Sequence, residues 1–334
     1  MQQLKKIGLL IPYSGEFPAL RETLLNPLKS YCNNRGIELF PEFIGNGSPK
    51  VVETAIEKLY YQEDVDVILG YVSYHVMVGL FDKVKKFRPK KFINISLGEV
   101  ITDDFQLLHP ENYILIGYHA WWMQSMLAYW LADQLQPESC LVCTSLYDAG
   151  YSLLECFRIG YHSGCSNKLD YSILKNNPGV FSADPLIAEI KRTNPSHVHV
   201  LLCGQELDDF IKKFEQEITY EPTISFAFPV EIKSKLSHPA FSKCYLVGDL
   251  HLYNKGNVLF ESPYKHIFSN VMDSILRYLN GEDPIINHLV IFMADLCDQT
   301  FKPVEQHIQF PDMSNAFKES AQSVPVWQNP YLCI

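Results

Sequence analysis

Along this chain, short runs of consecutive apolar residues, as long as a β-strand, alternate with segments in which apolar residues have helical spacing. Between the strand-like runs, apolar residues recur every three or four positions, as at Val76, Leu80 and Val84. Alternation of this kind predicts a parallel sheet covered by helices on both faces. In the first third, the expected strands are Lys6–Ile11, Ile37–Ile44, Val65–Leu69, Phe92–Ile95 and Tyr113–Ile116.

A second alternation begins after Gly117. An aromatic-rich helix is expected from Trp121 to Leu135, and strands and helices then follow one another with little padding as far as Ala227. Because 334 residues exceed one typical core, two domains are the natural division. The sequence therefore predicts an α/β protein with two Rossmann-like lobes, each a parallel sheet flanked by helices. The first helix, from about Ala19 to Tyr31, should be kinked or split by Pro27.

The net charge limits the kind of partner that the protein can bind, and the cysteine content indicates whether it contains disulfides. A formal net charge of −10 repels phosphate backbones, so nucleic-acid binding is not expected. No apolar run is long enough to cross a bilayer, so membrane insertion is not expected either. The nine cysteines are odd in number and scattered, which favours free thiols over disulfides. The expected location is cytoplasmic if the sequence is complete as written, and periplasmic or otherwise extracytoplasmic if a leader was trimmed.

Motifs of catalysis are not found in the sequence. It has no G-x-S-x-G, no H-E-x-x-H and no glycine-rich phosphate loop. His197 and His199 could share one face of a strand, but no third metal ligand lies within a few residues, which favours a structural role. We therefore expect no enzyme activity, no metal and no cofactor.

Hydroxyls, small residues and aromatics instead follow the predicted strands in both halves, where an α/β sheet builds its ligand sites. This location predicts a cleft for a small polar ligand. Some candidates have simpler interpretations: Ser14 and Ser96 as helix N-caps, Tyr147 and Tyr151 as surface aromatics, and Glu99 as a solvent-facing residue. The candidates are Ser14, Tyr71, Ser73, Tyr74, Ser96, Gly98, Glu99, Tyr118, Tyr147, Tyr151, Gln205 and Glu206.

Several segments, in order, resemble the type I periplasmic-binding-protein family, in its branched-chain amino acid and amide-binding division. They are KIGLLIPYSGEF, DVDVILGYVSYH, FINISLGE, CLVCTSLYDAGYS, HVHVLLCGQELDDFIKKF and the closing WQNPYLCI. The resemblance implies lobes joined by a multi-strand hinge, which close over a ligand. The expected division is 1–117 with 247–300 for the first lobe. The second lobe would take 118–246 with 301–334, a segment that crosses the hinge.

The resemblance also implies roles for the candidate residues. The loops with Ser73 and Tyr74, and with Ser96 to Glu99, would receive the carboxylate of an amino acid. Tyr147 or Tyr151, and Gln205 or Glu206, would hold its ammonium group. The sequence departs from the pattern of amino acid binders in two places. The loop with Ser73 has a single serine, and Glu99 would repel a carboxylate unless it is protonated or turned away.

The ligand could therefore be an amino acid, a neutral amide or a cationic amine. The leading hypothesis is non-enzymatic binding of such a solute as the substrate-binding component of an ABC-type importer, with the ABC permease as partner. The alternative is a cytoplasmic ligand sensor of the same fold that acts through a regulatory protein.

Overall fold

The computed structural model describes residues 5–12, 24–45, 47–96, 109–117, 120–145, 148–174, 182–202, 204–227, 236–249, 263–282, 289–298 and 300–305. The chain divides into two compact units. Unit 1 comprises Met1–Gly98, Thr102–His119 and Tyr264–Ile286, and unit 2 comprises Glu99–Ile101, Ala120–Pro263 and Asn287–Ile334. Within the described ranges, every helix is too short or too polar to span a bilayer.

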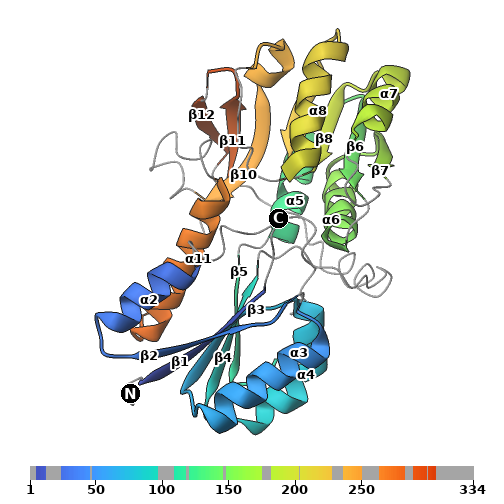
Figure 1. Cartoon of the computed structure of the whole chain (residues 1–334). Coiled ribbons are helices and arrows are strands. Elements are labelled where there is room, and N and C mark those ends of the chain that lie inside the picture. The colour runs from blue at the N-terminus through green and yellow to red at the C-terminus, as the bar shows by residue number, and fades with distance from the viewer. Residues whose placement is uncertain are drawn as a thin grey trace. The chain divides into compact units, whose positions relative to one another are not determined.

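Unit 1 is built on a five-stranded parallel sheet in the order β2-β1-β3-β4-β5 (Figure 1). Its central strands β1 and β3 are buried almost throughout, as expected of Val-, Ile- and Leu-rich strands covered on both faces. The edge strand β2 contains Pro41, which lacks the N–H group that a central strand would need. The strands are β1 (Lys6–Ile11), β2 (Glu38–Phe43), β3 (Val67–Tyr71), β4 (Lys91–Ser96) and β5 (Tyr113–Gly117).

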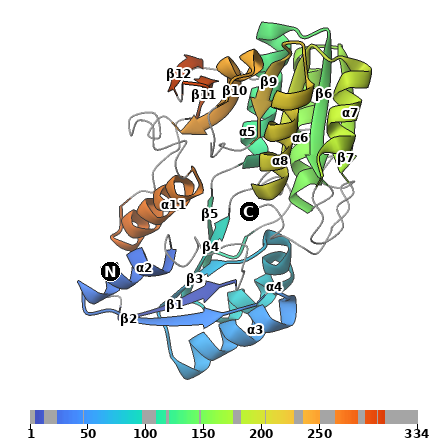
Figure 2. The ribbon, with the colours of Figure 1, turned by 45° about the horizontal axis from the view of Figure 1, so that its top comes forward.

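Helices cover both faces of this sheet (Figures 1 and 2). One face packs against α3 (Pro49–Glu57), its π-helical extension Lys58–Gln62 and α4 (Tyr74–Lys86). On the other side α2 (Asn26–Asn33) meets α11 (Pro263–Leu279), and the Tyr31 hydroxyl donates to Asn280 Oδ1 at 3.0 Å. Pro27 lies in the first turn of α2, and the two residues before that helix, Leu24 and Leu25, are π-helical.

Unit 2 is built on a seven-stranded sheet in the order β12-β11-β10-β9-β8-β6-β7. The strands β7, β6, β8, β9 and β10 run parallel, whereas β11 and β12 are antiparallel additions at one edge. The predicted α/β class, with sheets flanked by helices, is confirmed, and the sheets are parallel except at β11 and β12. The strands are β6 (Ser139–Ser145), β7 (Lys168–Leu174), β8 (His197–Leu201), β9 (Thr223–Phe226), β10 (Cys244–Asp249), β11 (Leu289–Asp295) and β12 (Thr300–Glu305).

The segment after β10 is divided differently from the expected boundaries. The sequence placed 247–300 in the first lobe, but β11 pairs with β10 over the whole strand, from Cys244↔Ala294 to Asp249↔Leu289. Only the stretch Tyr264–Ile286, which contains α11, belongs to unit 1. An antiparallel pairing between distant strands leaves no local sequence signal, which is why the apolar pattern did not indicate it.

The helices α5 (Ala120–Trp130) and α6 (Asp148–Gly164) approach each other closely in unit 2. A Cβ atom on Gly160 would lie 2.2 Å from the carbonyl oxygen of Ser125, so only glycine fits at this crossing. The Ser125 hydroxyl donates to the Cys156 carbonyl at 2.9 Å and ties the helices together. Both helices therefore act as one layer over the sheet.

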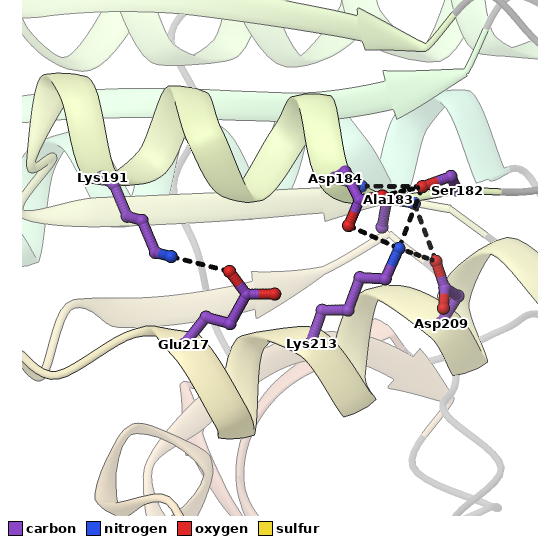
Figure 3. A network of polar contacts seen from close by, with 7 residues as sticks. All are labelled: Ser182, Ala183, Asp184, Lys191, Asp209, Lys213 and Glu217. Carbon is purple, nitrogen blue, oxygen red and sulfur yellow. Dashed lines mark hydrogen bonds and ion pairs between the residues drawn. The ribbon is translucent and has the colours of Figure 1, made fainter.

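The opposite layer of unit 2 consists of α7 (Asp184–Thr193) and α8 (Gly204–Glu217), which a polar network joins (Figure 3). Lys213 of α8 donates to Asp184 at 2.6 Å and lies 3.0 Å from Asp209. Asp209 in turn accepts the Ala183 N–H at the start of α7, at 2.8 Å. Asp209 of α8 thus caps the start of α7, and the network holds the two helices together.

Candidate functional site

The candidate residues fall into three groups in the structure. Side chains are described for Tyr71, Ser73, Tyr74, Gln205 and Glu206. Ser96 ends β4 and Tyr151 lies in α6, and for these two only the backbone is described. The remaining candidates lie outside the described residues and stay predictions; they are Ser14, Gly98, Glu99, Tyr118 and Tyr147.

In unit 1 the chain leaves the sheet at Tyr71 and enters α4 at Tyr74. Ser73 is the N-cap residue, with extended backbone angles of φ −51° and ψ 133°, and its carbonyl accepts the Met77 N–H at 3.1 Å. Its half-buried hydroxyl makes no capping hydrogen bond. The hydroxyl therefore lies at the carboxyl end of β3, beside the first-turn N–H groups of α4, as a ligand site of this fold class requires.

The two tyrosines that flank Ser73 are buried, each about 5% exposed. Tyr71 pairs with Ile95 in the β3–β4 register. The Tyr74 hydroxyl lies 2.9 Å from His109 Nε2, and its ring packs edge-on against His109 and Phe81. Tyr74 is thus engaged within unit 1, which leaves Ser73 as the polar side chain best placed at this junction.

A residue that the sequence did not suggest, Asn94, fixes the same junction. It is fully buried in β4. Its Oδ1 accepts the Val72 N–H at 3.3 Å, and its Nδ2 donates to the Val72 carbonyl at 3.0 Å. The carboxamide therefore satisfies both backbone groups of the first residue beyond β3, as a strand partner would. A polar residue inside the apolar run FINIS was the available signal.

In unit 2 a hydroxyl and a carboxyl meet at the carboxyl ends of adjacent strands. Ser145, the last residue of β6, donates its hydroxyl to Glu206 Oε2 at 2.5 Å. Glu206 lies in the first turn of α8, directly after β8, where the helix N-terminus favours a negative charge. Burial raises the pKa of Glu206, and the hydrogen bond from Ser145 offsets part of that rise.

Two further amide side chains near the carboxyl ends of these strands differ in exposure. Gln205, the other candidate on this turn of α8, is exposed. Gln124 of α5 is 1% exposed and was not suggested by the sequence; its Nε2 donates to the Ala227 carbonyl, just beyond β9, at 2.9 Å. No hydrogen bond from the described residues reaches Gln124 Oε1. Polar side chains thus lie at the carboxyl ends of three adjacent strands: Gln124 at β9, Glu206 at β8 and Ser145 at β6.

The described residues contain no group of three His, Cys, Asp or Glu side chains placed to hold a metal ion. His197 and His199 point into the core of unit 2, where both rings contact hydroxyl groups. The candidate residues offer hydrogen bonding in each unit by itself: one hydroxyl and helix N–H groups in unit 1, and mostly acceptors in unit 2.

Comparison with known proteins gives structural matches only. No model of a known protein family matches the chain, and no curated protein matches it in sequence. An ABC transporter substrate-binding protein from Sphaerobacter thermophilus has a TM-score of 0.65 and 13% identity, over 92% of this chain and 98% of that one.

Two further structures show the same architecture with a bound ligand. The branched-chain amino acid transporter substrate-binding protein LivJ from Streptococcus pneumoniae, in complex with isoleucine, has a TM-score of 0.62 and 10% identity, covering 90% of this chain and 99% of its own. A solute-binding protein of an ABC transporter from R. palustris, in complex with benzoate, has a TM-score of 0.58 and 16% identity, covering 90% and 96%.

Proposed function

We propose that this chain, which has the fold of the type I periplasmic solute-binding proteins, binds a small polar solute for an ABC-type importer and catalyses no reaction. The proposal puts the ligand between the two units, at the carboxyl ends of both sheets, and includes closure by a hinge motion. The partner is then an ABC permease, and the protein works outside the cytoplasm.

The observation that carries this proposal is the Ser145–Glu206 pair. The Ser145 hydroxyl offsets only part of the cost of burying the Glu206 carboxyl group at the start of α8, and a ligand N–H group would supply a second partner. Gln205 lies on the same turn and can add a further contact. The chemistry of unit 2 thus favours a ligand with an amine, ammonium or amide group.

Unit 1 supplies the opposite chemistry. The hydroxyl of Ser73 and the N–H groups of the first turn of α4 suit an oxygen atom of the ligand, whether a carbonyl or a carboxylate. An amino acid or a short amide carries both kinds of group and is the ligand class that we propose. Isoleucine and benzoate, which occupy two of the structural neighbours, are ligands of those proteins and serve here as probes.

Thermal denaturation with a panel of probes tests the function. The panel contains isoleucine, benzoate, acetamide, urea and a polyamine. A ligand that binds only the folded state at a hundred times its Kd adds about 2.7 kcal/mol to the free energy of unfolding. We expect at least one amine or amide probe to raise the melting temperature. If no probe does so, the proposed ligand class is wrong.

Matched variants of α8 locate the binding site. Glu206→Gln should abolish the thermal shift of a cationic probe, because it removes the negative charge that the probe pairs with. Glu217→Gln is the control: Glu217 lies at the far end of the same helix, paired with Lys191 at 2.7 Å. An equal loss in both variants would contradict binding at Glu206.

The alternative of a ligand sensor has one observation in its favour. The described cysteines are free thiols, and several of them, such as Cys140 and Cys143, are fully buried, as is common in reducing compartments. Affinity purification with the bound probe distinguishes the two functions. Recovery of membrane permease subunits supports transport, whereas recovery of a soluble regulatory protein supports the sensor.

A further inference from the structure

A chain of polar side chains runs through the core of unit 2. His197 and His199 lie on β8, both completely buried, and β9 beside them contributes Thr223 and Ser225. His197 Nδ1 lies 2.7 Å from Thr223 Oγ1, and its Nε2 lies 2.8 Å from Ser225 Oγ. His199 Nδ1 lies 2.8 Å from the same Ser225 oxygen. We call these four side chains the histidine–hydroxyl chain.

The number of protons on each group determines which member of the histidine–hydroxyl chain donates each hydrogen bond. The Thr223 hydroxyl donates its only proton to the Ser196 carbonyl at 3.2 Å, so toward His197 it can only accept. His197 therefore carries its proton on Nδ1. Its Nε2 is then an acceptor, and the Ser225 hydroxyl donates to it.

The position of the proton on His199 follows in the same way. Since the Ser225 proton points to His197, the Ser225 oxygen accepts from His199 Nδ1–H. His199 Nε2 is left as a bare lone pair, buried and without a hydrogen-bond partner in the described part of the chain. The ring of His199 stacks on Phe157 at 3.9 Å between centroids. Any proton that this nitrogen accepts produces a buried cation.

In the described part of the chain, no carboxylate offsets such a cation, because only burial and the neighbouring His197 act on the His199 ring. The titratable groups on the packed elements are His197 on the same strand, Cys140 and Cys143 on β6, and Cys156 and Tyr161 on α6; Glu155 and Arg158 of α6 pair with each other at 2.6 Å. Burial raises the pKa of the three thiols and of the phenol, so all four are neutral in acid. β9 contributes only hydroxyls. Burial, and for His199 also the proximity of His197, lowers the pKa of the two imidazoles, that of His197 to about 3.

We propose that the histidine–hydroxyl chain is an acid-sensitive lock: it holds β8 to β9 while both imidazoles are neutral, and unit 2 opens in acid before unit 1 does. The fully buried polar side chains of unit 1 in the described ranges, Asn94 and Asn112, do not titrate.

The direction of the effect follows from proton binding. Each buried imidazole is neutral when folded but binds a proton when unfolded, so unit 2 loses stability as the pH falls below about 6.5. Per histidine, the ratio of folded to unfolded protein falls about tenfold for each pH unit until the folded pKa is reached. The stabilisation is fully present above the unfolded pKa.

The test compares His199→Asn with the wild type over pH 4 to 7. Asparagine keeps an N–H donor for Ser225 and removes the basic nitrogen. We expect the ratio of the two unfolding constants to change about tenfold per pH unit below about pH 6. His162→Asn is the control, because that imidazole is exposed at the end of α6 and the same ratio should stay flat. A flat ratio for His199→Asn overturns the proposal.

Two measurements on the wild-type protein need no variant. In ¹⁵N NMR, both buried histidines should be Nδ1–H tautomers, and an Nε2–H tautomer at His199 would overturn the proton assignment. Hydrogen exchange in acid should expose amides of β8 and β9 at a higher pH than those of β3 and β4. Simultaneous exposure of both sheets, or earlier exposure of β3 and β4, would contradict the lock.

Discussion

Unit 1 and unit 2 share an α/β architecture but bury different polar side chains. In the first, carboxamides satisfy backbone groups: Asn94 pairs with Val72, and Asn112 donates to the Val84 and Lys90 carbonyls at 2.8 and 3.0 Å. In the second, imidazoles lie in the core and contact hydroxyl groups. A carboxamide has fixed donors and acceptors at every pH, whereas an imidazole does not. Similar sheets can therefore respond differently to acid.

The largest expected effect comes from giving unit 1 a titratable group. In Asn94→Asp the carboxylate still accepts from Val72 N–H but repels the Val72 carbonyl, which costs about 3 kcal/mol at pH 7. The folded pKa of the new carboxyl is raised, so the loss should shrink as the pH falls through that pKa and vanish below about 3.9. Hydrogen exchange of β3 and β4 at several pH values measures it.

Asn94→Ala is the matched control for that experiment. It leaves both Val72 groups unpaired, so its loss of stability should be the same at every pH. If Asn94→Asp were equally independent of pH, the paired hydrogen bonds to Val72 would not be what stabilises the junction.

A smaller effect is expected from interrupting the histidine–hydroxyl chain in unit 2. Ser225→Ala removes the partner of both imidazoles and should cost about 2 kcal/mol. Thr223→Val removes one of the two hydroxyl partners of His197, while the backbone N–H at position 223 still donates to the Ser196 carbonyl, and it should cost about half as much. Chemical denaturation followed by tryptophan fluorescence measures both, since Trp121, Trp122 and Trp130 lie in unit 2. Equal losses would mean that Ser225 serves only one ring.

The smallest effect concerns the carboxyl group of Glu206, in the first turn of α8. Because burial raises the folded pKa of Glu206, ionisation of this group opposes folding above its unfolded pKa. Glu206→Gln should therefore stabilise the ligand-free protein at pH 7, by less than about 1 kcal/mol, and the gain should disappear near pH 4. A destabilised variant at pH 7 would show that the Ser145 hydrogen bond outweighs burial.

The strand–loop–helix junctions were predictable because their signal is local. The apolar run at Val65–Leu69 and the helical spacing of Val76, Leu80 and Val84 located β3 and α4, with Ser73 between them. Glu206 was a candidate because it follows a strand, and it meets Ser145 there. Asn94 was missed because its partner, Val72, lies 22 residues earlier in the chain.

The sequence by itself determined the two α/β halves, the order of their elements and the polar loops after the strands, because periodicity and turn residues act over a few positions. Only the tertiary structure decided which side chains those loops meet. It placed β11 beside β10, Asn94 against Val72, and a serine between two buried histidines. Such contacts depend on strand pairing between distant segments, and packing rather than local propensity sets them.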